Sequence, residues 1–161
     1  MDLSLSFTSN NASINKMLDY YFRSEEINCD YKCNNCKKTT SITKLLEISI
    51  LPPVLICQFK RFNCNGKFNG QVSFDEYLNL KKYIACDFES NKVNEEYLQS
   101  TKYELFALSE HIGNSLYCGH YIAYAKRNKE WYKFNDNRVS LCDNDGPSGS
   151  GAYMLFYKRV L

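Results

Sequence analysis

Histidine, asparagine and aspartate occur within one short stretch near the C-terminus, GHYIAYAKRNKEWYKFND, which spans residues 119–136. Apolar and aromatic residues dominate both parts of this stretch, and a basic turn separates them, which is the pattern of a β-hairpin. If the hairpin turns at residues 127–128, His120 lies directly opposite Asn135 on one face of the sheet. If the length of the connecting loop differs by one residue, His120 lies opposite Asp136 instead.

Either arrangement gives His120 a polar neighbour that can orient its ring. Directly opposed residues in antiparallel strands have Cβ atoms about 4.5–5.5 Å apart, so an amide or carboxylate oxygen can accept a hydrogen bond from one imidazole nitrogen. The other nitrogen is then available as a general base for a nucleophile. The alternative interpretation is a structural histidine near a strand end. Gly119 directly before His120 and the polar pair across the hairpin favour the catalytic interpretation.

The loop that leads into this hairpin, HIGNSLYCGH, is rich in small and polar residues. Gly113 and Gly119 would let its backbone approach a ligand closely. The simpler interpretation of the loop is an ordinary connection between strands.

One amphipathic helix is predicted over residues 11–22. Ile14, Met17, Leu18 and Tyr21 follow the spacing of a single helical face, and either Ser13 or Asn11 is available as the N-cap.

The remaining elements are predicted to be strands. Leu46, Ile48 and Ile50 alternate with polar residues, which predicts a strand with one buried face. The nearly continuous apolar run VLICQFKRF, residues 54–62, indicates a central strand that is covered on both faces. Residues 72–80 are predicted to form a short strand or an extended segment, and further strands are predicted at residues 103–109, 120–126, 130–135 and 153–158.

Composition limits the possible architectures and partners. A chain of 161 residues with 44% hydrophobic and 15% aromatic residues predicts one α+β domain, rich in antiparallel strands. The net charge of +2 argues against nucleic acid as a partner. No apolar run approaches the roughly 18–20 residues of a membrane span, and no secretion signal is evident. We therefore expect a cytoplasmic or nuclear protein with no membrane partner.

Eight cysteines are spread irregularly along the chain, which favours reduced thiols over a disulfide framework. Cys33 and Cys36 form a C-x-x-C knuckle, the spacing of one half of a zinc ribbon. A structural zinc site needs four ligands, and this knuckle supplies two. Cys29 is a possible third ligand.

The segments LPPVLICQFKRF, YELFALSEHIGNSLYCGHYIAYAK, EWYKFND and AYMLFYKR occur in this order. Together they resemble the C-terminal half of a ubiquitin-specific protease, a papain-like cysteine deubiquitinase. The resemblance implies a β-rich palm with part of the fingers and without the N-terminal thumb half. Residues 1–161 would form the C-terminal part of one catalytic domain, with about 1–50 in the fingers and 51–161 in the palm. Without the thumb half, one apolar sheet face should be uncovered.

The resemblance also implies roles for individual residues. His120 matches the catalytic histidine, Asn135 the residue that orients it, and Asp136 an acidic neighbour that helps in positioning or in stabilising the transition state. Gly119 and Tyr121 match residues that line the narrow channel for the C-terminal tail of ubiquitin. The implied partners are ubiquitin and ubiquitinated proteins.

The nucleophile is the main departure from the family pattern. In the family it is a cysteine in an Asn- and Gly-rich box, and nothing in residues 1–161 resembles that box. Cys57 lies in an apolar strand, where a thiol is normally inert. Cys118, two residues before His120, is the least implausible substitute. We therefore expect this chain alone to be inactive and to act within a longer or split protein whose N-terminal half supplies the cysteine.

Two other functions remain open. One is a non-catalytic ubiquitin-binding module, and the other is a zinc-ribbon nucleic-acid binder, which the near-neutral charge disfavours. No cofactor is expected for catalysis. A structural zinc ion is possible, because the family often pairs this C-x-x-C with a second one further upstream.

Overall fold

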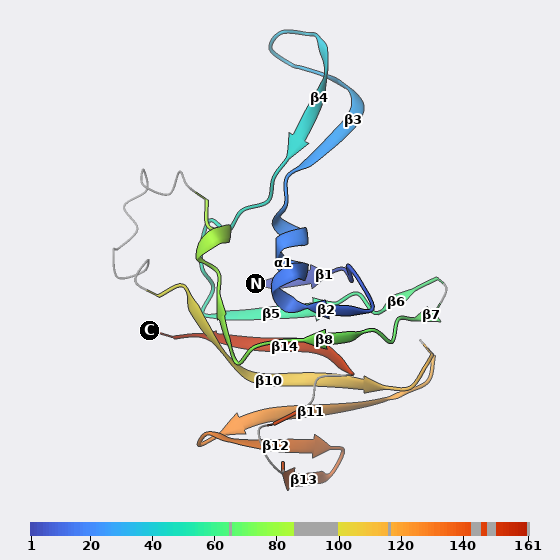
Figure 1. The fold of residues 1–161 in the computed structure, drawn as a ribbon, viewed down its shortest axis with the longest axis vertical. Helices are drawn as coiled ribbons and strands as arrows, with labels where there is room; N and C mark the ends of the chain where they lie inside the picture. The colour runs from blue at the N-terminus through green and yellow to red at the C-terminus, as the bar shows by residue number, and fades with distance from the viewer. Residues whose placement is uncertain (65, 86–99, 116, 143–145, 148–150, 161) are drawn as a thin grey trace.

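The computed structural model describes residues 1–64, 66–85, 100–115, 117–142, 146–147 and 151–160. Its main layer is an eight-stranded sheet in the order β1-β5-β14-β10-β11-β12-β13, with β9 paired to β10 (Figure 1). The strands are β1 (Asp2–Leu5), β5 (Val54–Phe59), β9 (Tyr77–Asn79), β10 (Lys102–Ile112), β11 (His120–Arg127), β12 (Glu130–Asn135), β13 (Arg138–Leu141) and β14 (Ala152–Arg159).

This sheet is antiparallel except at one edge, where β1 runs parallel to β5. The strand-rich α+β prediction is confirmed, but the sheet is mixed. The prediction that β5 is covered on both faces is wrong, because its residues alternate between buried and less buried. Leu55, Cys57 and Phe59 face the core, while Ile56 and Gln58 lie on the other, partly accessible face.

Helix α1 (Ile14–Phe22) covers the face of the sheet that carries the core. Its N-cap is Ser13, whose hydroxyl accepts a hydrogen bond from the Lys16 N–H at 3.3 Å. Ile14, Met17 and Leu18 are buried, as the spacing predicted, and so is Phe22, whereas Tyr21 is only partly buried. The helix starts later than predicted, because Asn11–Ser13 form strand β2, which pairs with β8 (Gln71–Ser73).

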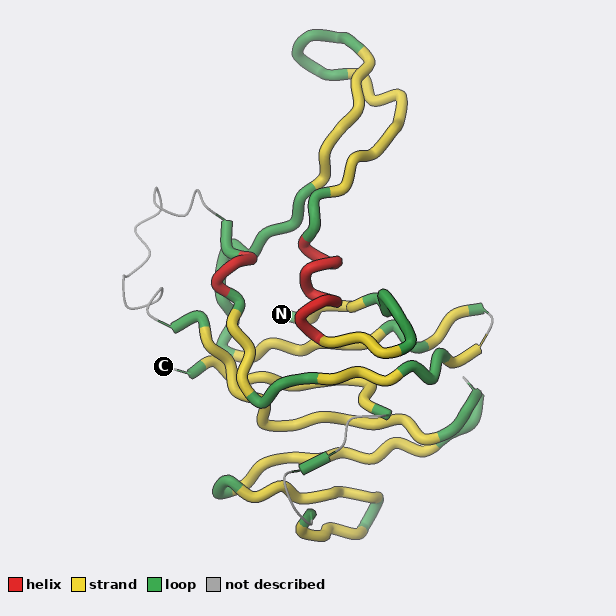
Figure 2. Tube along the Cα trace, in the orientation of Figure 1, coloured by secondary structure: helices red, strands yellow, loops and turns green. Residues whose placement is uncertain are grey.

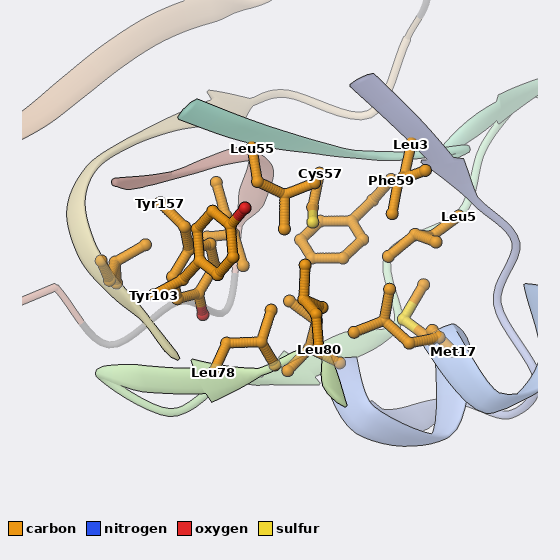
Figure 3. Packing of buried hydrophobic residues seen from close by; sticks show 14 of the residues in the cluster. Leu3, Leu5, Met17, Leu55, Cys57, Phe59, Leu78, Leu80, Tyr103 and Tyr157 are labelled. Atoms are coloured by element: carbon orange, nitrogen blue, oxygen red, sulfur yellow. The ribbon is translucent and has the colours of Figure 1, made fainter. Parts of the chain in front are cut away.

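Side chains from the helix, the sheet and the segment that contains β8 and β9 form one core (Figure 3). Two buried tyrosines in this core place their hydroxyls on backbone carbonyls, which satisfies the polar end of each ring. Tyr103 donates to the Pro52 carbonyl at 2.6 Å, and Tyr157 donates to the Asp75 carbonyl at 2.8 Å. A short 3-10 helix, Lys81–Tyr83, follows β9.

A hairpin of β3 (Glu25–Lys32) and β4 (Thr39–Lys44) projects away from the sheet and carries residues 33–38 at its tip (Figures 1 and 2). The sequence did not predict these strands, because most of their side chains are exposed and therefore show no apolar alternation. The strand predicted at residues 46–50 is wrong. Only an isolated bridge between Ile48 and Ile84 occurs there, and Ile50 is 67% exposed.

Within the described ranges, no helix has the length and apolar character needed to cross a membrane.

A second small hairpin, β6 (Phe62–Asn63) and β7 (Gly66–Lys67), follows β5 and lies near the end of β10.

The outer face of β11–β13 is apolar and exposed. The register places Ala123, Phe134 and Val139 in one row and Ala125, Tyr132 and Leu141 in the next. Phe134 is 40%, Val139 59% and Leu141 55% exposed. Large contiguous apolar surfaces of this kind are uncommon on monomeric proteins and usually mark sites of association.

We predict that this face binds the dye ANS in the isolated chain. The double change Val139→Thr and Leu141→Thr should lower the ANS fluorescence, because it removes apolar area while keeping β-branched or strand-compatible side chains. Val54→Thr, at a residue 37% exposed on another strand, is the matched control and should change the signal less. Equal ANS fluorescence in wild type and double variant would show that this face is not the exposed apolar surface.

Candidate active site

A two-residue turn connects β11 and β12 and sets their register. Asn128 and Lys129 occupy the turn with φ of 51° and 70°, and Arg127 pairs with Glu130. Positive φ at both central residues is the signature of a type I′ turn, whose twist matches that of the paired strands. The predicted turn at residues 127–128 is therefore wrong by one residue.

The register consequently differs by two residues from the one predicted, and His120 is directly opposite neither Asn135 nor Asp136. A shift of two residues leaves every side chain on the same face of the sheet, since side chains alternate with a period of two. His120 and Asn135 are thus diagonal neighbours, which long side chains can still bridge. The His120 Nε2 atom lies 2.5 Å from the Asn135 Oδ1 atom.

This contact determines which nitrogen carries the proton. The Asn135 Oδ1 atom can only accept, so His120 Nε2–H donates and the neutral ring has its lone pair on Nδ1. Asp136 lies farther away, with its Oδ2 atom 4.0 Å from His120 Nε2. Asp136 is in the turn after β12 at φ 51° with a 77% exposed side chain, and at this distance it makes no direct hydrogen bond to the ring.

Gly119 and Tyr121 flank His120 at the start of β11, and alternation along the strand places the Tyr121 and His120 side chains on opposite faces. The Tyr121 ring is 53% exposed, and its centroid lies 4.8 Å from that of His111. Gly119 lies against the same ring, since a Cβ atom there would fall 2.0 Å from His111 Nε2.

His111 was not identified from the sequence, although it is the only other histidine and opens the loop before His120. Its side chain is buried, and its ring meets the edge of Phe62 at 5.2 Å. Burial and the positive charge of Lys67 lower the pKa of His111, so the ring is neutral near pH 7. Its Nδ1 atom has no hydrogen-bond partner in the part of the chain that the structure describes.

Neither cysteine considered as a nucleophile is paired with His120. Cys57 is buried, and burial raises the pKa of its thiol to about 12, as expected for an inert thiol. Cys118 is exposed in the loop before β11, and within the described residues it makes no hydrogen bond to His120.

The C-x-x-C knuckle forms the tip of the β3–β4 hairpin. Cys33 N–H donates to the Lys38 carbonyl at 3.0 Å, and Lys37 turns the chain back at φ 58°. Hydrogen bonds from the backbone N–H groups of Cys36 and Asn35 and from the Cys36 thiol lower the pKa of Cys33, which favours the thiolate form that binds metal. In the described ranges, no group of three or more Cys, His, Asp or Glu residues is placed to hold a metal ion. The knuckle therefore fits two of the four ligands of a structural zinc site, and Cys29 does not complete it.

His120, the first residue of β11, is an imidazole oriented by a neighbouring amide, an arrangement that cysteine-type hydrolases use for their general base. The family model described as ubiquitin carboxyl-terminal hydrolase matches residues 5–157. The chain therefore belongs to the ubiquitin carboxyl-terminal hydrolase family.

Relatives from yeast and plants support this assignment. The chain is 32% identical over 164 residues to ubiquitin carboxyl-terminal hydrolase 8 of Saccharomyces cerevisiae, a match that covers 98% of the chain and 34% of that protein. It is 31% identical over 165 residues to ubiquitin carboxyl-terminal hydrolase 16 of Arabidopsis thaliana, covering 99% of the chain and 16% of that protein. The chain thus spans about a third or less of the length of these two relatives.

Solved structures show the same fold. The yeast SAGA DUB module with an Sgf73 mutant contains a chain that matches with a TM-score of 0.82 and 32% identity, covering 99% of this chain and 35% of that one. The SAGA Ubp8/Sgf11/Sus1/Sgf73 DUB module bound to ubiquitin aldehyde matches with a TM-score of 0.79 and 33% identity, covering 99% of this chain and 36% of that one. The predicted membership of the ubiquitin-specific proteases is confirmed.

We predict that Gly119→Ala destabilises the chain by about 1–3 kcal/mol, the usual cost of forcing extra volume into a packed site. The added methyl would fall 2.0 Å from His111 Nε2 and 2.9 Å from the Ile112 carbonyl, so ring and backbone must both move. Gly151→Ala is the control, since its Cβ would meet its nearest atom at an ordinary 3.6 Å. Urea unfolding measures both variants, and equal midpoints for the two would refute the close packing of Gly119 on His111.

Proposed function

We propose that this chain supplies the histidine half of a thiol-dependent ubiquitin hydrolase, which cleaves after the C-terminal glycine of ubiquitin. The observation that carries the proposal is the 2.5 Å contact between His120 Nε2 and Asn135 Oδ1, which leaves Nδ1 as the base. In the proposal, residues 1–161 form the C-terminal part of one catalytic domain within a longer or split protein. Residues 1 to about 50 would belong to the fingers and 51–161 to the palm. The match of nearly the whole chain to about a third of a DUB-module chain supports the view that the chain is one part of a longer protein.

The chemistry of the proposal requires a cysteine from an N-terminal segment. His120 Nδ1 takes the proton of that thiol, and the thiolate attacks the carbonyl carbon of the terminal ubiquitin glycine. The tetrahedral intermediate collapses to a thioester as the imidazolium gives its proton to the leaving lysine amine. Water, deprotonated by the same imidazole, then hydrolyses the thioester and regenerates the thiol.

The other site residues have supporting roles in this proposal. Asn135 holds the ring and its tautomer throughout, because its amide oxygen accepts from Nε2–H in both the neutral and the charged state. Asp136, at 4.0 Å, stabilises the imidazolium that forms after the first proton transfer. Gly119 and Tyr121 flank the reacting histidine, and in this proposal they line the narrow channel for the ubiquitin tail.

One observation favours a second candidate, a ubiquitin-binding module without catalysis. Within the described residues, no thiol is hydrogen-bonded to His120. Such a module has no chemical need of an oriented imidazole, and for that reason the hydrolase is preferred. Ubiquitin is the proposed partner in both cases, in the cytoplasm or the nucleus, and nucleic acid in neither.

We predict that the chain alone leaves a fluorogenic ubiquitin amide intact and that it turns the substrate over when assembled with a segment carrying the cysteine box of this family. In that assembly, His120→Ala should lower kcat about 10²–10⁴-fold, the usual contribution of a positioned general base. Asn135→Ala should also lower kcat, while Asn135→Asp, which keeps an acceptor for Nε2–H, should retain more activity. Steady-state kinetics with the purified assembly measure each effect.

Two results would decide against the hydrolase. Tight ubiquitin binding with no turnover in the assembly would establish the binding module. Robust turnover by the chain alone, abolished by Cys118→Ala, would make Cys118 the nucleophile and remove the need for a second segment.

We also propose that Cys33 and Cys36 form half of a structural zinc site that is completed by ligands from the longer protein. We predict that in the assembled protein Cys33→Ser with Cys36→Ser releases zinc, measured by a chromophoric chelator and by elemental analysis. Cys29→Ser is the control and should leave the zinc content unchanged. Loss of zinc in the control, or retention in the double variant, would overturn the assignment of the two ligands.

A further inference from the structure

Lys67, at the end of β7, donates two hydrogen bonds to the backbone of a distant segment. Its Nζ atom lies 2.7 Å from the carbonyl oxygen of His111 and 2.8 Å from that of Gly113. These two carbonyls lie on either side of the end of β10, where the chain enters the loop that leads to His120. One ammonium group therefore fixes the path of the backbone at this exit.

The cation is held there without a carboxylate. Among the described residues, no Asp or Glu forms an ion pair with Lys67, and burial together with the positive charge of Arg61 lowers the pKa of its ammonium. Both effects oppose a charged group at this position. The two carbonyl acceptors offset them, because hydrogen bonds from a charged donor are stronger than those between neutral groups.

The fixed backbone is in direct contact with the residue that precedes His120. A Cβ atom added to Gly113, which has φ of 129°, would lie 3.0 Å from the Gly119 Cα atom, so the two glycine backbones are closely packed. On its other side Gly119 packs against the buried ring of His111. The base of the loop is thus held by two contacts: the Lys67 ammonium binds the backbone carbonyls of His111 and Gly113, and the His111 ring packs against Gly119.

A second contact connects the same two segments. Asn69 Nδ2 donates to Asn114 Oδ1 at 3.3 Å. Lys67 and Asn69, the two neighbours of Phe68 in the sequence, therefore both contact the segment around the end of β10. The last pair of the β10–β11 ladder is Ile112 with His120. Movement at the loop base would therefore be transmitted to the His120 backbone, and through it to the side chain that faces Asn135.

We propose that Lys67 is a positioning residue for His120, which acts through the backbone carbonyls of His111 and Gly113 and keeps the imidazole within reach of Asn135. The importance of this role for catalysis rests on the proposed function of His120 as the base. The predicted effect of Lys67 on the orientation of the His120 ring does not rest on that function, because it concerns contacts within this chain alone.

The test uses the two histidines of the chain as separate reporters. In a ¹⁵N-histidine-labelled sample near pH 8, each ring gives one set of imidazole nitrogen signals, and His120→Gln assigns them. Wild-type His120 should be in the Nε2–H tautomer. Lys67→Met, which keeps the length of the side chain and removes its donors, should shift His120 to a mixture of tautomers and speed amide exchange at the Ile112–His120 pair about tenfold or more.

Three controls separate positioning from general stability. Lys67→Arg retains the charge and the donors, so it should restore the single tautomer. Lys102→Met changes an exposed lysine at the opposite end of β10 and should leave His120 unchanged. If Lys67→Met does not fold, Lys67→Gln, whose shorter side chain cannot reach both carbonyls, gives the same comparison.

An unchanged His120 tautomer and unchanged exchange in folded Lys67→Met or Lys67→Gln would overturn the proposal, as would a lower melting temperature with no effect on His120. These readouts involve no ubiquitin. A failure of the assembly to cleave ubiquitin would therefore contradict the proposed function while leaving the positioning role intact.

Discussion

The register of the β11–β12 hairpin is the constraint on which the site depends. A type I′ turn at Asn128 and Lys129 fixes that register, and the register decides that His120 and Asn135 share one face as diagonal neighbours. A slip of one residue would move one of them to the other face and remove the hydrogen bond. A slip of two would keep them on one face at a different separation. The chemistry of the imidazole is therefore set by two residues at the far end of the strand.

Backbone carbonyls accept hydrogen bonds from two cations near this end of the sheet. The buried Arg61 donates from Nε to the Ala152 carbonyl at 2.6 Å and from one terminal nitrogen to the Gly70 carbonyl at 2.7 Å. Lys67 does the same at the end of β10. Each cation thus joins segments that are distant in sequence. Among the described residues, Asp136 is the carboxylate whose oxygen lies 4.0 Å from His120 Nε2.

The sequence predicted best what depends on local pattern. The apolar spacing of Ile14, Met17 and Leu18 predicted the helix, and the hairpin that contains His120 was predicted with the correct pairing face. The exact register was missed because Lys129 is not a residue that usually adopts a positive φ, so the turn was placed one residue early. The β3–β4 hairpin was missed because its exposed side chains show no period of two. The Lys67–His111 contact joins two segments far apart in the chain, and no local pattern could indicate it.

Under the proposed function His120 is an oriented base to which no thiol of the described residues is hydrogen-bonded, and this is physically reasonable if the site is assembled from two segments. The contacts that fix the His120 ring lie within this chain. Asn135 accepts from Nε2–H, and Lys67 holds the backbone at His111, whose ring packs against Gly119. No free energy is therefore needed to orient the imidazole when a nucleophile arrives. Groups that are preorganised in this way accelerate a reaction most. A segment that supplies the cysteine need only place its sulfur near Nδ1. The exposed apolar face of β11–β13 offers area that a further segment could bury, while the contact that orients His120 is formed within this chain.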